Sequence, residues 1–107
     1  MFKELFVKAI NEGSKWKIKK SKEKTVNKGK TYLGWKDDDY EIRIYNVGDG
    51  EFQIWFNLED SSGNDYSDIN GIKSYIKSYA KDIDMEIPTP DKNDIKSLDQ
   101  VDPMEEF

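Results

Sequence analysis

Residues 40–59 read YEIRIYNVGDGEFQIWFNLE, and their pattern predicts a β-hairpin around which the rest of the sheet is expected to form. Apolar and polar residues alternate on both sides of a short turn, as in two strands that each bury one face. Gly48 and Gly50 give the turn backbone conformations that other residues resist. The buried face is expected to carry Tyr40, Ile42, Ile44, Phe52, Ile54, Phe56 and Leu58. Trp55 then lies on the opposite face, beside Arg43, and outside the predicted core.

Two more strands are predicted before this hairpin. Residues 15–20, KWKIKK, alternate lysines with Trp16 and Ile18, which is typical of a strand with one exposed face. Residues 31–35, TYLGW, predict a second strand. The lysine-rich stretch between the two strands is expected to be a polar, mobile connection.

Two helices are predicted, one before the strands and one after them along the chain. At residues 2–12 the apolar side chains recur at helical spacing and give a short amphipathic helix, which we expect to lie on the sheet. These apolar residues are Phe2, Leu5, Phe6, Ala9 and Ile10. Apolar residues from Ile69 to Ile83 predict a helix of about four turns, with Ser67 or Asp68 as its N-cap.

The composition excludes several classes of site. The 107 residues include no cysteine and no histidine, so a disulfide framework, a thiolate or imidazole zinc site and a histidine-based triad are excluded. Asp37, Asp38 and Asp39 lack the spacing of a calcium loop, and we expect a solvated turn there. No stretch resembles a signal peptide or a membrane span. We therefore expect a cytoplasmic, non-enzymatic protein with no cofactor, no metal and no membrane partner.

Charge is segregated along the chain. Residues 1–36 hold eleven lysines and three glutamates, a local balance of +8 in a protein whose formal net charge is -5. From Asp84 onward there are eight acidic residues and two lysines. The potential that a ligand meets depends on where charges lie rather than on their sum. The acidic total therefore does not exclude nucleic acid as a partner.

Lysines and aromatic residues are interleaved in residues 15–36, KWKIKKSKEKTVNKGKTYLGWK. Single-stranded nucleic acid is bound by this combination, because cations neutralise the phosphates and flat rings stack on unpaired bases. The candidate nucleic-acid-binding residues are Trp16, Lys17, Lys19, Lys20, Lys30, Tyr32, Trp35, Arg43 and Trp55. The competing interpretation is a solvated lysine-rich hairpin whose rings belong to the core.

The last residues, VDPMEEF at 101–107, offer a partner a free carboxylate, a ring and flanking negative charges. The candidate partner-binding residues are Met104, Glu105, Glu106 and Phe107. Residues 94–107, DIKSLDQVDPMEEF, resemble the acidic C-terminal tip of bacterial and phage single-stranded DNA-binding proteins. This resemblance implies that the tip recruits a replication or repair protein. The tip is also able to compete with nucleic acid by folding back over the lysines.

A second resemblance lies in residues 34–45, GWKDDDYEIRIY, which are similar to the positive-cofactor-four type of single-stranded DNA-binding domain. That family implies a curved antiparallel sheet followed by one helix, and a homodimer formed through the helix. An oligonucleotide/oligosaccharide-binding barrel of five strands is an open alternative.

The predicted fold class is α+β, a small curved antiparallel sheet of four to five strands with an N-terminal helix and a C-terminal helix. Residues 1–87 form a single domain in this prediction, and residues 88–107 form a disordered acidic tail because they have too little apolar surface to offset the entropy of ordering.

The predicted function is binding of single-stranded DNA, or of RNA, by a protein encoded by a phage or a mobile element. The alternative is a small acidic phage inhibitor that imitates nucleic acid and blocks a host nuclease or a CRISPR-type nuclease. The alternative would use Asp37, Asp38, Asp39, Glu59, Asp60, Asp65 and Asp68.

Overall fold

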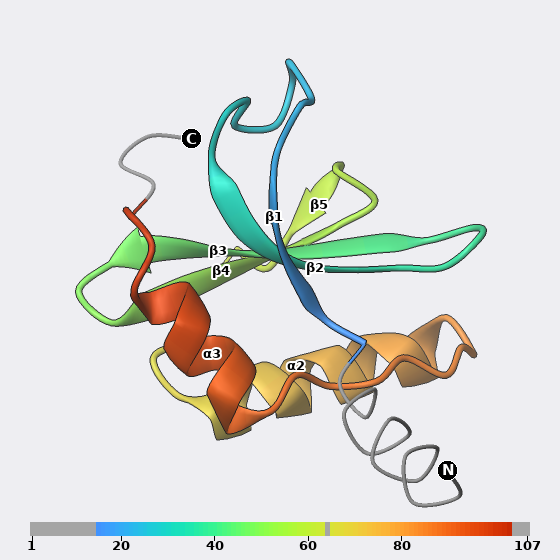
Figure 1. The fold of residues 1–107 in the computed structure, drawn as a ribbon. Coiled ribbons are helices and arrows are strands. Elements are labelled where there is room, and N and C mark those ends of the chain that lie inside the picture. The colour runs from blue at the N-terminus through green and yellow to red at the C-terminus, as the bar shows by residue number, and fades with distance from the viewer. Residues whose placement is uncertain (1–14, 64, 104–107) are drawn as a thin grey trace, which may run out of the picture.

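The computed structural model describes residues 15–63 and 65–103, which form an antiparallel sheet with two helices on one of its faces (Figure 1). The strands are β1 (Lys17–Lys20), β2 (Thr31–Lys36), β3 (Glu41–Gly48), β4 (Glu51–Phe56) and the short β5 (Asp60–Ser61). They pair in chain order, so β1 and β5 are the two edges. Within the described residues the sheet stays open, which argues against a closed barrel. The helix predicted at residues 2–12 lies outside the described residues.

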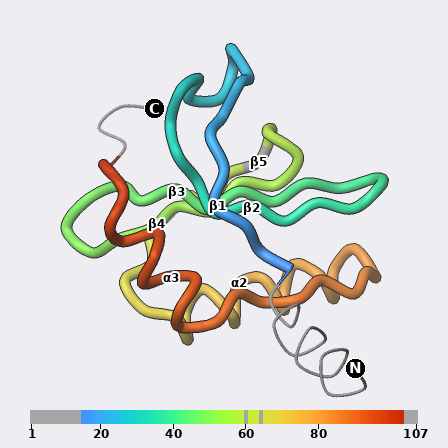
Figure 2. Tube along the Cα trace, viewed as in Figure 1, coloured from blue at the N-terminus to red at the C-terminus, as the bar shows by residue number. Residues whose placement is uncertain are grey.

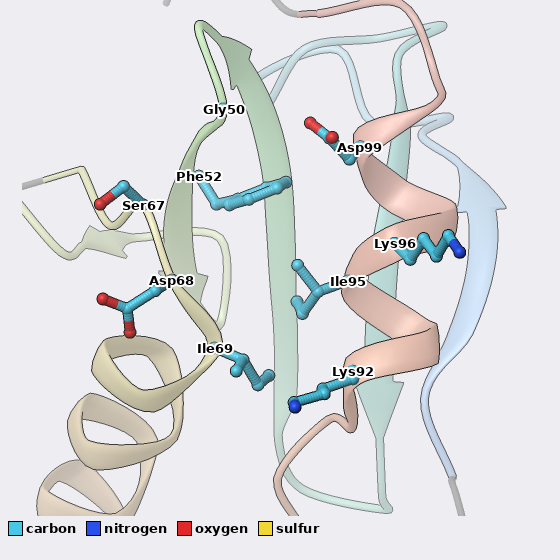
Figure 3. A pocket seen from close by; sticks show the side chains of 9 residues that line it. All are labelled: Gly50, Phe52, Ser67, Asp68, Ile69, Lys92, Ile95, Lys96 and Asp99. Atoms are coloured by element: carbon cyan, nitrogen blue, oxygen red, sulfur yellow. The ribbon is translucent and has the colours of Figure 1, made fainter.

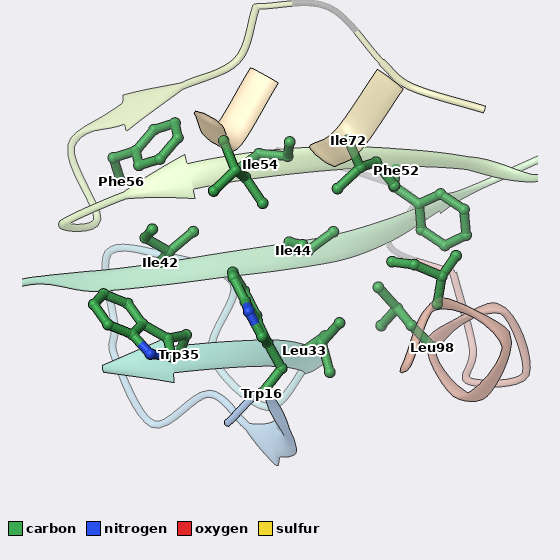
Figure 4. Close-up of a cluster of buried hydrophobic side chains, with 12 residues drawn as sticks. Trp16, Leu33, Trp35, Ile42, Ile44, Phe52, Ile54, Phe56, Ile72 and Leu98 are labelled. Atoms are coloured by element: carbon green, nitrogen blue, oxygen red, sulfur yellow. The ribbon is translucent and has the colours of Figure 1, made fainter. Parts of the chain in front are cut away.

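The β3–β4 hairpin has the predicted register and faces. Ile44 pairs with Ile54, and the five predicted apolar residues between Ile42 and Phe56 are buried in the main core, which Figure 4 shows on the sheet. Leu58 is the exception, because it packs on the opposite face of the sheet. The backbone takes positive φ values of 51° at Asn57 and 63° at Leu58, so the strand alternation ends there.

Helix α2 (Ile69–Asp82) confirms the prediction of a helix after the sheet. The side chain of Asp68 caps it by accepting a hydrogen bond from the backbone N–H of Gly71. Buried Ile72 and Ile76 face the sheet, and the ring of Tyr79 stacks on Phe56 with centroids 3.6 Å apart. The apolar face proposed for a homodimer therefore packs on the chain's own sheet.

Helix α3 (Lys92–Asp99) corrects the prediction of a disordered tail at residues 88–107. Asp91 and Asp94 form a capping box at its start, and Ile95 and Leu98 are buried in the main core. The side-chain amide of Asn46 donates hydrogen bonds to the carbonyls of Leu98 and Val101, at 3.3 and 3.1 Å. The prediction was wrong for residues 88–103, because buried apolar side chains, a capping box and the hydrogen bonds from Asn46 together hold this segment on the sheet.

The two faces of the sheet differ. The helices cover one face, whereas residues 21–30 between β1 and β2 extend on the other side (Figure 2). A second, smaller cluster of buried Val26, Tyr32 and Tyr45 lies on this second face. We call it the open face, because α2 and α3 pack only against the other one.

Candidate nucleic-acid interface

Trp16 and Trp35 do not lie where base stacking requires them. Their exposed fractions are 3% and 6%, and both belong to the main core on the helix-covered face (Figure 4). The indole N–H of Trp16 donates to the carbonyl of Pro88, 3.0 Å away. The prediction that these two rings stack on bases is therefore wrong, and the competing interpretation of core residues is right for both.

Tyr32 is on the open face but is covered by Arg43. The guanidinium carbon of Arg43 lies 4.3 Å from the centre of the Tyr32 ring, in cation–π geometry. The ring lies above Gly34, where a Cβ would come within 2.5 Å of Cε2 of Tyr32. Tyr32 is only 5% exposed, so the prediction that it offers its ring to a base is also wrong.

Arg43 is itself 3% exposed and tied to its neighbours, which corrects the prediction that it contacts nucleic acid freely. Its Nη1 donates to the hydroxyl oxygens of Ser21 and Tyr45, at 2.8 and 3.1 Å. Its Nε donates to Oε2 of Glu41 at 3.1 Å, and Nη2 lies 4.0 Å from a carboxylate oxygen of Glu23. Arg43 therefore fastens the β1–β2 connection to the sheet.

Burial changes the ionisation of this group of side chains. Desolvation raises the pKa of the Tyr32 hydroxyl above its ordinary value, although the positive charge of Arg43 acts in the opposite direction. For Arg43, burial acts to lower the pKa, but the hydrogen bond to Tyr45 and the nearby groups outweigh it and raise the pKa. Arg43 is a permanent cation beneath the open face.

The lysines are placed as predicted, at the surface. All nine lysines between residues 15 and 36 are exposed, including the predicted Lys17, Lys19, Lys20 and Lys30. Beside them lies a groove of about 590 Å³ lined by Lys19, Lys20, Lys22, Glu23, Tyr32, Lys36, Glu41 and Arg43. Five cations and two carboxylates line this groove, which we call the basic groove, so its lining is net positive.

The strand register connects the lysines to Trp55. Lys17 pairs with Gly34, Gly34 with Arg43, and Arg43 with Trp55, so these residues form one row across the open face. Trp55 is half-buried, and its indole N–H donates to Oε1 of Gln53 at 2.7 Å. The prediction that Trp55 lies outside the main core is confirmed, and within the described residues it is the one tryptophan with a partly exposed side chain.

The cluster of Val26, Tyr32 and Tyr45 was missed in the sequence. The available signal was Val26, the single aliphatic residue in the polar stretch 21–30. The side chain of Val26 packs in the cluster with Tyr32 and Tyr45 of the sheet. The Ser21 hydroxyl donates a hydrogen bond to the Val26 carbonyl at 2.8 Å. The connection is therefore held on the sheet, which contradicts the predicted mobile loop.

A second groove, of about 360 Å³, lies between α3 and the start of α2 (Figure 3). Phe52, Ile69 and Ile95 supply apolar surface there, and Lys92, Lys96, Asp68 and Asp99 supply charges that balance. It therefore has no preference for an anionic ligand.

Other classes of site find no support in the described part of the chain. Asp37 accepts hydrogen bonds from the backbone N–H groups of Asp39 and Tyr40, which is the expected turn. Across residues 15–63 and 65–103 no three acidic side chains are gathered closely enough to hold a metal ion. In the same residues no helix has the length and apolarity to cross a membrane.

Comparison of the chain with protein-family models, with curated proteins and with solved structures found no match. The geometry of the open face therefore carries the functional inference. The candidate partner-binding residues 104–107 lie outside the described residues.

Proposed function

We propose that this protein binds single-stranded nucleic acid, DNA in the first instance, on the open face of its sheet and catalyses no reaction on it. The observation that carries the proposal is the row from Lys17 through Arg43 to Trp55, with the basic groove alongside. It brings cations and one accessible ring onto the same surface. Phosphates and unpaired bases are the ligand groups that such a surface fits.

The proposed interface is smaller than the sequence predicts. Its cations are the exposed Lys17, Lys19, Lys20 and Lys30 together with the other lysines of the basic groove. Its ring is Trp55 alone, because Trp16, Tyr32 and Trp35 are buried. Arg43 acts as a positioning residue that holds the lysine-bearing connection against the sheet. With one stacking ring, most of the affinity would come from the phosphates and would fall steeply with salt.

The alternative, an acidic imitation of nucleic acid, receives less support from the geometry. Asp37–Asp39 lie in the turn between Lys36 of β2 and Glu41 of β3, which pair with each other. Glu59 lies at the same end of the sheet, because it follows Asn57, whose backbone N–H donates to the Glu41 carbonyl. Asp65 and Asp68 lie toward the other end, because Tyr66 bridges to Phe52 near the β3–β4 turn. The acids are thus divided between two ends, whereas Lys19, Lys20, Lys22 and Lys36 line one groove.

A fluorescence titration with oligo-dT at two salt concentrations tests the proposal. We expect quenching of tryptophan emission at low salt, and loss of that quenching in the variant Trp55→Phe, because Trp16 and Trp35 are shielded. Replacing Lys17, Lys19 and Lys20 with Glu should weaken binding by about tenfold or more and reduce the salt slope by roughly 0.7 for each lost phosphate contact.

The matched control replaces Lys73, Lys77 and Lys92, which lie on α2 and α3, with Glu. It changes the net charge by the same amount as the Lys17, Lys19, Lys20 variant. It should bind oligo-dT nearly as well as the native chain. Equal loss in both triple variants would mean that total charge rather than the open face governs binding. Absence of quenching in the native chain at low salt would refute the proposal, and an intact cellular function in the Lys17, Lys19, Lys20 variant would favour the acidic alternative.

The proposed partner of residues 104–107 is a replication or repair protein. A chain that lacks Met104–Phe107 should keep its oligonucleotide affinity if the tip serves only a partner. It should bind oligo-dT more tightly if the tip competes for the lysines.

A further inference from the structure

An apolar groove lies next to the first described residue of the chain. Its volume is about 550 Å³, and it is formed by the C-terminal half of α2, the α2–α3 linker, Trp35 of β2 and Lys15, which precedes β1. Trp35, Ala80, Met85 and Ile87 supply its apolar surface, of which Met85 and Ile87 are only half-buried. Because Trp35 and Ala80 are buried residues, the groove is an open margin of the core.

The rim of this groove is mostly cationic. Lys15, Lys77 and Lys81 line it, against one carboxylate, that of Glu86. Lys15 is also the residue at which the described chain begins, so residues 1–14 are attached directly to the rim. An occupant with an apolar stripe and flanking carboxylates would match both the surface and the rim.

Residues 1–14, MFKELFVKAINEGS, have these properties. Phe2, Leu5, Phe6, Ala9 and Ile10 form the apolar stripe of the helix predicted at 2–12. So short a helix is marginal alone in water and needs a surface on which to bury its stripe. Glu4 and Glu12 supply carboxylates, but Lys3 and Lys8 balance them, so the match depends on the apolar stripe rather than on net charge. Gly13 precedes the rim, where its freedom of φ lets the chain turn back.

We propose that residues 2–12 form this amphipathic helix and dock by their apolar stripe in the groove beside Lys15, closing the open margin of the core within the same chain. The proposal is independent of nucleic-acid binding, because the groove is lined by α2, the linker after it and the core residue Trp35 rather than by the open face. Docking would also restrain Lys15, two residues before β1.

The cysteine-free chain permits a direct test with one introduced thiol. In the full chain carrying Ala80→Cys, the thiol lies in the groove. It should react with a maleimide about tenfold more slowly than the same thiol in a chain that also carries Leu5→Asp and Phe6→Asp. The docked segment would block access to the thiolate, and the two aspartates would release it. The polar-face change Lys8→Glu should leave the slow rate intact. A thiol at exposed Ser97, made by Ser97→Cys, should react at one rate in all backgrounds.

Equal rates for the Ala80→Cys thiol with and without the two aspartates would overturn the proposal. Protection that grows with protein concentration would also overturn it, because the occupant would then be the segment of a second copy. Ile87→Cys in the linker provides a second probe if Ala80→Cys lowers the thermal stability, and the same rate comparison applies to it.

Discussion

Arg43 is the residue on which the open face depends. A buried guanidinium is tolerated because Glu41, Ser21 and Tyr45 satisfy its donors, and because the ring of Tyr32 lies beneath it. Removing one partner of such a group leaves the others unpaired, so the cluster acts as a unit. The side chain that the sequence offers as a ligand contact is therefore a structural centre that holds the β1–β2 connection on the sheet.

The raised pKa of Tyr32 predicts a loss of stability at high pH. The folded chain keeps the hydroxyl proton at a pH where the unfolded chain releases it, so this stabilisation is complete below the ordinary value of 10.0 and is lost as the pH rises through the folded value. Tyr32→Phe removes this contribution. In urea denaturation at about pH 8 and about pH 11, the native chain should lose more stability than the variant. Equal losses in the two chains would contradict the prediction.

At the scale of elements, the strands and α2 were predictable because each carries a repeating signal. Alternation gives β3 and β4 their faces, and helical spacing together with Asp68 gives α2 its position and its start. Helix α3 was missed because it buries few residues in an acidic stretch, and composition outweighed its capping box. The face on which Trp55 lies was predictable, because Trp55 belongs to the hairpin. The faces of Trp16 and Trp35 were not predictable, because these residues lie outside the hairpin.

If α3 is part of the core, shortening one buried side chain in it should destabilise the whole domain. Leu98 is fully buried, and Leu98→Ala should lower the free energy of unfolding by about 2 to 5 kcal/mol. The exposed neighbour Ser97 provides the control, since Ser97→Ala should change it by about 0.5 kcal/mol or less. Urea denaturation measures both. An unchanged midpoint for Leu98→Ala would mean that α3 is not packed in solution.

At the scale of the whole molecule, position matters more than net charge. The formal net charge is -5, yet eight exposed lysines lie in β1, in β2 and in the connection between them. A ligand that approaches this side meets a positive potential, whereas the β2–β3 turn presents three aspartates. The molecule is therefore strongly polarised, which its low isoelectric point conceals.

This polarity predicts retention on a phosphate-bearing cation exchanger at neutral pH, which a protein of uniform negative charge would not show. The native chain should bind at low salt and elute as the salt rises, because screening shortens the reach of the lysines. The chain with Lys17, Lys19 and Lys20 changed to Glu should pass through. Elution of the native chain in the void volume would show that the lysines do not act together.

The position of β1 at the edge of the sheet has a further consequence, which concerns encounters between copies. An edge strand exposes unpaired backbone groups that invite another strand, and here three of its four residues are lysines while the fourth, Ile18, is 43% exposed. Mutual repulsion keeps two such edges apart. A polyanion that neutralised these ammonium groups would remove this protection, so crowding many copies along one polymer would also expose them to strand-to-strand aggregation.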